Sequence, residues 1–246
     1  MATTLNASSS SNGLIASGDA SGNLALQGNG TTGLTIDLNG KINVPNIALG
    51  TAVAGMMEYD GRVPYFTPSG TQRGVVPGMQ YYVLNSGLAG ANATGAQNLL
   101  GVGVTLTANT FYAFNILAYM SKTAGTTSYT ISTLFGGTAT ITSIAYLFEH
   151  NSDSTSFADA PYNGTQSCSV IQTASAAVVV PASTSANNYK WIRFTGTVSI
   201  NAGGTFIPQY TLSAAPGGAY TVQNGSYFLI YPIGASGSNI SVGTWA

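Results

Sequence analysis

The residues best able to do chemistry gather in one short window. The chain carries only six Lys or Arg and seven Asp or Glu residues, yet four of them, Glu58, Asp60, Arg62 and Arg73, fall within residues 58–73. Carboxylates and guanidinium groups this close form charge-assisted hydrogen bonds, which define geometry whatever they add to stability. The window therefore predicts binding or structural registration, with no set of residues for nucleophilic catalysis.

A second polar cluster surrounds the single histidine, His150, in the segment EHNSD. Glu149 and Asp153 flank it, and the three could act as an acid–base group or hold a cation at a strand end. A metal site needs further histidine or cysteine ligands, or six or more oxygens for calcium, and the spacing of a calcium loop is absent. A polar loop is the favoured interpretation, and the sequence leaves open whether Glu149, His150 and Asp153 bind an ion.

Other catalytic and cofactor motifs are missing from the sequence. There is no GxSxG nucleophile elbow, and the stretches GNGTTG and GGTATI are turns with no helix behind them to receive a phosphate. Glycoside cleavage needs two facing carboxylates, and the acidic residues after residue 78 all lie on one predicted loop. We therefore expect no enzyme activity, no cofactor and no metal, and we assign no catalytic, cofactor-binding or metal-binding residue.

Aromatic side chains offer a different kind of recognition. Tyr81, Tyr82, Trp191 and Trp245 are candidates for a surface that stacks against a glycan. The alternative is structural packing, because aromatic residues dominate protein cores and most of those in this chain lie in predicted strands.

Composition excludes two classes of partner. Charged residues make up 5% of the chain and the net charge is −1, so nucleic acid is not an expected partner. Neither is a membrane, because no apolar run is long enough to span one and the start MATTLNASSSSNGL lacks the features of a signal peptide. We expect a protein folded in a cytoplasm that, with so little charge to keep copies apart, assembles with itself.

The elements that position these residues are predicted to be strands throughout. From Leu14 to Ile47, short alternating apolar segments are separated by GNG at 28–30 and NG at 39–40, which are tight-turn signals. After Met79, ten runs rich in Val, Ile, Tyr, Phe and Thr predict an antiparallel β-sandwich, a jelly roll. The runs are 79–84, 101–106, 110–120, 127–135, 138–150, 167–173, 176–180, 189–200, 204–213 and 226–234.

The segment before the sandwich holds too little apolar surface to fold alone. Its alternating segments, from Leu24 to Val44, hold seven large apolar residues, too few for an independent core in a segment of ~40 residues. A slender trimeric β-stalk, in which each chain contributes one face, would supply the missing core, and so would an arm that adds strands to another protein. Residues 1–12 are small and polar and are expected to be disordered alone.

The stretch AGMMEYDGRVPYFTPSGTQRGVVPGMQYY resembles a segment that recurs in virion proteins of tailed bacteriophages, especially fibre-type proteins of marine and cyanobacterial phages. The preceding SGNLALQGNGTTGLTIDLNGKINV is similar to the N-terminal repeat-like units of phage tail and head fibres, and MATTLNASSS to their starts. The region after residue 85 is similar to their C-terminal β-domains, which look like the trimeric jelly rolls of the tumour-necrosis-factor and C1q type. The matching positions of the first stretch are Gly55, Met57, Glu58, Tyr59, Asp60, Gly61, Tyr65, Thr67, Pro68, Arg73, Gly74 and Val75.

The resemblance implies a virion structural protein, assembled in the cytoplasm of a bacterial host. Residues 1–55 would be an N-terminal arm and β-stalk that attaches to capsid, connector or tail proteins, 56–78 a connector or neck, and 79–246 the jelly-roll head. The implied function is a non-enzymatic, homotrimeric head or tail fibre or spike whose head binds the host surface, with a host-surface glycan as a partner. The alternatives are a capsid decoration or cement protein that stabilises the shell, and a carbohydrate-binding module.

In this arrangement the charged window falls where a narrow stalk widens into a head. Bonds between chains among its four charged residues would hold three copies in one register. A solvated linker with scattered charges is the alternative. The window is also predicted to be a stiff, extended passage, because it is punctuated by Pro64, Pro68 and Pro77.

Overall fold

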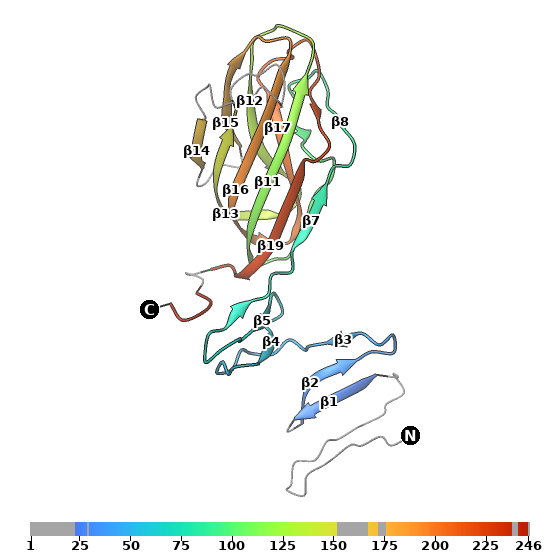
Figure 1. Ribbon diagram of the computed structural model, residues 1–246, viewed down its shortest axis with the longest axis vertical. Coiled ribbons are helices and arrows are strands. Elements are labelled where there is room, and N and C mark those ends of the chain that lie inside the picture. The colour runs from blue at the N-terminus through green and yellow to red at the C-terminus, as the bar shows by residue number, and fades with distance from the viewer. Residues whose placement is uncertain (1–22, 29, 152–166, 172–175, 238–240, 246) are drawn as a thin grey trace, which may run out of the picture. The chain divides into compact units, whose positions relative to one another are not determined.

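The computed structural model of the 246-residue chain describes residues 23–28, 30–151, 167–171, 176–237 and 241–245 (Figure 1). Every regular element in these ranges is a strand, as predicted. Within them, no helix is long and apolar enough to cross a lipid bilayer. Residues 1–12, expected to be disordered alone, lie outside the described part. The chain divides into two compact units, Met1–Val76 with Ser241–Ala246, and Pro77–Ile240.

The second unit is a jelly roll, as the sequence predicts. Numbered in chain order, its eight main strands pair as 1-8-3-6 in one sheet and as 2-7-4-5 in the other, the strand order of a jelly roll. These strands are β7 (Gln80–Val83), β10 (Val104–Leu106), β11 (Thr110–Lys122), β12 (Tyr129–Gly136), β15 (Ala176–Ser183), β16 (Asn188–Ala202), β17 (Gly204–Leu212) and β19 (Tyr227–Ala235).

An inserted pair of strands widens the first of these sheets. β13 (Thr140–His150) and β14 (Ser167–Ile171) are antiparallel partners, and β13 also pairs with β16. Figure 1 shows β13, β16, β11, β19 and β7 side by side in this larger sheet. Three two-residue strands, too short to show alternation in the sequence, were not predicted: β8 (Leu88–Ala89), β9 (Gln97–Asn98) and β18 (Thr221–Val222).

The core of the jelly roll lies between its two sheets. In β11, buried and half-buried residues alternate from Thr110 to Met120, as expected for a strand with one face on the core. Phe135 stacks on Phe206 with ring centroids 4.8 Å apart, and Phe114 meets Phe135 edge-on at 5.7 Å. Because each buried Phe or Ile contributes about 1.5–3 kcal/mol, this continuous cluster is the main source of stability in the unit.

The first unit contains two small antiparallel sheets. One consists of β1 (Leu24–Gly28), β2 (Thr31–Ile36) and β3 (Ile42–Asn43), and the other of β4 (Met57–Tyr59), β5 (Pro64–Phe66) and β6 (Gly74–Val75). The predicted NG turn lies between β2 and β3, with Gly40 at a φ of 75°. The Asp37 carboxylate accepts hydrogen bonds from the backbone of Asn39 and Lys41, at 2.9 and 2.8 Å, which fixes this turn.

The connector differs from the stiff, extended passage that its prolines suggested. Residues 57–75 fold back twice as the β4–β5–β6 meander, so that expectation is wrong. Pro64 is compatible with a strand because it is the first residue of β5, a place where sheets tolerate the missing donor. Its carbonyl oxygen accepts a hydrogen bond from the backbone of Val76 at 2.8 Å.

Most large apolar side chains in the described part of the first unit are at least partly exposed to solvent. Among its described residues, Val63 and Tyr65 are the buried hydrophobic ones. The shortage of buried apolar surface expected from the sequence is therefore present in the single chain. The large hydrophobic residues that stay exposed before residue 77 are Leu24, Leu38, Ile42, Ile47, Leu49, Val53, Met57, Phe66 and Val76.

Candidate functional site

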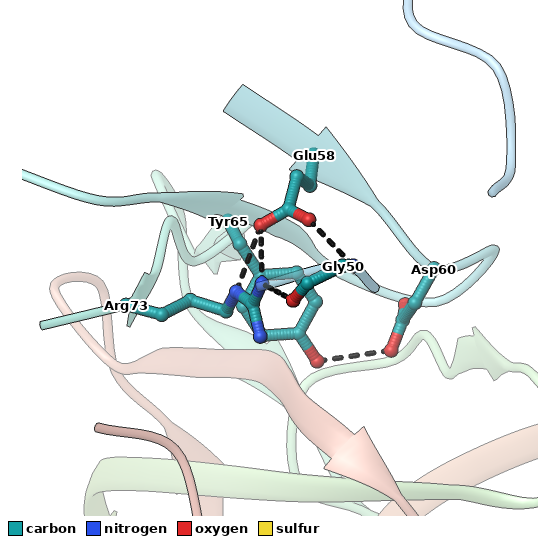
Figure 2. A network of polar contacts seen from close by, with 5 residues as sticks. All are labelled: Gly50, Glu58, Asp60, Tyr65 and Arg73. Atoms are coloured by element: carbon teal, nitrogen blue, oxygen red, sulfur yellow. Dashed lines mark hydrogen bonds and ion pairs between the residues drawn. The ribbon is translucent and has the colours of Figure 1, made fainter. Parts of the chain in front are cut away.

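Glu58 and Arg73 form a buried ion pair inside the β4–β6 meander (Figure 2). Glu58 lies in the middle of β4, and Arg73 immediately precedes β6. Nε and Nη2 of Arg73 each lie 2.8 Å from Oε2 of Glu58. The Glu58 side chain is 2% exposed and that of Arg73 is 18% exposed, so water screens the pair weakly.

Gly50 completes this cluster through its backbone. Its N–H donates to Oε1 of Glu58 at 3.1 Å, and its carbonyl oxygen accepts a hydrogen bond from Nη2 of Arg73 at 2.6 Å (Figure 2). The backbone N–H of Ile47 also donates to the carbonyl of Tyr59, at 3.0 Å. Together these bonds hold the irregular segment 47–50 against the meander.

Asp60 organises the turn between β4 and β5. Its Oδ1 accepts hydrogen bonds from the backbone of Arg62 and Val63, both at 2.9 Å, and Oδ2 accepts one from the Tyr65 hydroxyl at 2.9 Å. Gly61 has a φ of 85°, and a Cβ there would lie 2.5 Å from the Asn46 side chain, so glycine is required. The turn and the ion pair are thus parts of one network, in which Tyr65 lies between them (Figure 2).

The titration of this network follows from its hydrogen bonds. Burial raises the pKa of Asp60, but the N–H donors of Val63 and Arg62, the Tyr65 hydroxyl and the Arg62 charge outweigh it and lower this pKa overall. Burial is also the largest reason why the pKa of the Tyr65 hydroxyl is raised, and its bond to Asp60 adds to the effect. At neutral pH the carboxylate is charged and the phenol is neutral, the states that their hydrogen bond needs.

The structure brings the predicted window residues together within one chain. Glu58 and Arg73 form the ion pair, while Asp60 and Arg62 occupy the adjacent turn. Their predicted role in bonds between chains stays a prediction. Sequence reasoning assigned no role in the site to Tyr65, whose three-residue strand is too short to show a period, or to Gly50, whose backbone role leaves no signal in the sequence.

The meander buries its charged face and exposes an apolar one. Glu58 pairs with Tyr65 across β4 and β5, and both are buried. The next pair, Met57 and Phe66, projects from the opposite face, and these side chains are 64% and 41% exposed. A sheet with solvent on one side normally has the reverse polarity. This apolar face is therefore an unusual surface for a chain that stays alone.

The four predicted recognition aromatics do not form one platform. Tyr81 and Trp191 both lie on the outward face of the larger sheet, on β7 and β16. Tyr82 projects from the other face of β7, and its ladder partner is the buried Phe228. Trp245 belongs to the first unit, where its indole N–H donates to the Val242 carbonyl at 2.8 Å. Their role in binding stays a prediction.

The outward face of the larger sheet is rich in aromatic and aliphatic side chains. Cross-strand neighbours place a group there from four adjacent strands, β16, β11, β19 and β7, and its large members are half-buried except for Tyr81, which is 61% exposed. Tyr81 and Tyr227 are in ring contact at 5.8 Å, and the Tyr227 hydroxyl donates to Asn115 at 3.1 Å. The large members of this face are Tyr81, Leu117, Tyr119, Trp191, Tyr227 and Leu229.

Glu149 and His150 do not act as a pair. As consecutive residues of β13 they project from opposite faces. Glu149 lies 3.4 Å from Arg193 on the partly exposed side, whereas His150 is buried, with Nδ1 2.6 Å from the Asn151 carbonyl oxygen. Asp153 lies outside the described residues, and the described residues contain no group of His, Cys, Asp and Glu that could hold a metal ion.

Lys122, which sequence reasoning did not single out, occupies a cage of carbonyl oxygens. It is the last residue of β11 and is buried. Its ammonium group also lies 5.3 Å from the centroid of the Tyr129 ring. Two loops, those after β11 and after β15, are thereby joined at one end of the jelly roll. The carbonyls that accept hydrogen bonds from Nζ are those of Ala124, Gly125, Ser185 and Ala186.

Comparisons with known proteins add little to this description. No protein-family model matches the sequence, and no curated protein matches it. Among solved structures, the chain is similar over 87% of its length to one described as "Structure of infectious bursal disease virus Gt strain", at 8% identity and a TM-score of 0.17. It spans 56% of the length of that chain. Similarity at this level carries no argument about fold or function.

Proposed function

We propose that this chain is a non-enzymatic structural protein of a bacteriophage virion that assembles as a homotrimer. The first unit would attach it to other virion proteins, and the jelly roll would be the displayed head of a fibre or spike. The observation that carries the proposal is the first unit's inverted polarity, with Glu58 buried and Met57 and Phe66 exposed. Such a unit gains stability when its apolar face is covered by sister chains.

The head offers a second surface for self-association. The outward face of its larger sheet carries the six aromatic and aliphatic residues named above, with the Arg193–Glu149 pair beside Leu117. Aromatic residues and Arg are enriched in protein interfaces. The sequence resemblance to trimeric jelly rolls agrees with this use of the sheet. In a closed trimer the contacts are head-to-tail, so each copy uses two different patches, and these two are the same in every copy.

The absence of repelling charge supports assembly as well. The whole chain has a net charge of −1, so copies approach one another with little electrostatic cost. The ion pair between Glu58 and Arg73 lies inside one chain and leaves the apolar face uncharged.

Native mass spectrometry and cryo-electron microscopy test the proposal at two levels. The purified full chain should have the mass of three copies, about 75 kDa from three chains of 25.0 kDa. Virions that contain the protein should show a three-fold density of this size, projecting outward for a fibre or spike and lying flat between capsid subunits for a decoration protein. A stable monomer whose residues 23–76 resist proteolysis would overturn the proposed assembly.

A further inference from the structure

A groove opens on one flank of the jelly roll, where the two sheets are not closed against each other. β7 is the end strand of the larger sheet and pairs with β19, while β10 is the end strand of the smaller sheet and pairs with β17. The groove has a volume of about 340 Å³ and is lined by residues of β7, β10 and β19. This volume is in the range of sites for small ligands.

Core-side residues of β7 are reachable from solvent in this groove. Gln80 and Tyr82 pair with Ile230 and Phe228, whose side chains are buried in the core. Gln80 and Tyr82 share that inner face, yet both are exposed, Tyr82 by 39%. Inward residues of a sandwich are normally covered by the opposite sheet. The Tyr82 ring therefore offers an apolar surface that is accessible from outside.

The chemistry of the lining selects a neutral, amphipathic ligand. None of the lining residues is charged, so an ionic ligand would lose hydration without gaining a counter-charge. A purely hydrocarbon ligand would cover the Gln80 amide and the Tyr82 hydroxyl without satisfying them. A sugar-like ring, with one apolar face and a rim of hydroxyl groups, can pack on Tyr82 and hydrogen-bond to Gln80 at the same time.

We propose that this groove binds a neutral hexose unit of a glycan. The apolar face of the sugar ring packs on Tyr82 and Val102, which line the groove and are each 39% exposed, and its hydroxyl groups exchange hydrogen bonds with the Gln80 amide. The site lies wholly within one jelly roll, so it does not depend on the proposed trimer. Three copies on one particle would add avidity to a weak single site.

Saturation-transfer NMR on the full chain tests this binding. The probes are the methyl glycosides of glucose, galactose and mannose, with methyl glucuronide as the anionic counterpart. Transfer to at least one neutral glycoside, and much weaker transfer to the glucuronide, are expected. Tyr82→Ala should raise the Kd by about tenfold, the upper range for loss of one aromatic contact. Trp245→Ala, which removes an exposed aromatic outside the groove, should leave it unchanged.

A second variant keeps the test valid if Tyr82→Ala does not fold. Gln80→Leu keeps a side chain of similar size and removes the amide at the rim, and it should weaken binding with no change in thermal unfolding. If no saturation is transferred to any of the three neutral glycosides, the proposal is overturned. It is also overturned by equal binding of the glucuronide, or by a Kd that follows Trp245 and ignores Tyr82. Native mass spectra of the same samples report the trimer separately, so the two proposals fail independently.

Discussion

Met57 and Phe66 are direct cross-strand partners on β4 and β5, and both project from the face opposite to the buried Glu58. This pair forms the centre of an apolar surface on a sheet only three strands wide. The residues that follow along the same face are Tyr59 and Pro64. The single chain leaves this surface uncovered, which gives the first prediction.

A charge at Met57 should weaken the assembly. In Met57→Glu the carboxylate would have to be desolvated if sister chains cover the face, which is unfavourable by several kcal/mol unless the group is paired. Sedimentation velocity should show the equilibrium shifting toward single chains at micromolar concentration. Thr184→Glu, which adds the same charge at an exposed site of the jelly roll, is the control and should leave the proposed trimer intact. If the two variants sediment alike, Met57 is not in the interface.

Removal of Arg73 should destabilise the first unit much more than removal of an exposed partner does. Arg73→Ala leaves the Glu58 carboxylate buried and uncompensated, a change that typically costs about 3–5 kcal/mol. Native-state hydrogen exchange at residues 57–75 measures the loss. Arg193→Ala is the matched control, because its pair with Glu149 is long and partly exposed and is worth about 0–1 kcal/mol.

A double variant tests whether the loss of stability in Arg73→Ala comes from the uncompensated charge of Glu58. Glu58→Gln combined with Arg73→Ala removes the buried charge together with its partner. It should therefore be more stable than Arg73→Ala alone, because no uncompensated carboxylate remains. A double variant that is less stable than the single one would mean that the Glu58 carboxylate has another partner that matters more.

Lys122 should contribute to the stability of the jelly roll in spite of being a buried cation. Lys122→Met keeps an apolar stem of similar length but removes the donors that hold the carbonyls of the two loops. Buried acceptors without a donor cost about 1–3 kcal/mol, which denaturant unfolding of the second unit should detect. Lys41→Met, at an exposed position, is the control. Equal midpoints for the two variants would show that the cage has no net effect.

Alternation, together with enrichment in Val, Ile, Tyr, Phe and Thr, predicted the ten strands of the jelly-roll unit that have three or more residues, because strands with one face on a core carry a period of two. It could also have placed Lys122, Asn188 and Lys190 on the inner face, since each occupies a core-facing position of its strand. No cluster of charged residues marks these three positions in the sequence. The pairing order of the sheets could not be derived, since it depends on contacts between strands far apart in the chain.

The fold of residues 57–75, in the connector, could not be predicted from residue patterns. Strands of two or three residues, such as β4, β5 and β6, are too short to display a period. The prolines therefore remained the main signal and predicted an extended passage, although Pro64 lies where a strand tolerates proline. The Glu58–Arg73 pair spans fifteen positions and follows from the meander, so it could not be derived before the fold was known.

Asp60 should make the first unit sensitive to acid. Its pKa in the folded chain is below the ordinary value of 3.8, so the folded state binds the proton less readily than the unfolded state does. The stabilisation is therefore fully present above the ordinary pKa and is lost as the pH falls through the folded value. Hydrogen exchange at residues 57–75 should accelerate between about pH 5 and about pH 2, after correction for the intrinsic rate.

Asp60→Asn isolates this contribution. The amide oxygen can still accept hydrogen bonds from the backbone of Arg62 and Val63, but the side chain no longer titrates. The variant should be less stable than the natural chain at neutral pH, because the charged acceptor of the Tyr65 hydroxyl is gone. Its stability should also change less with acid, and the two curves should converge at the lowest pH. Parallel curves over the whole range would assign the acid sensitivity to another carboxylate.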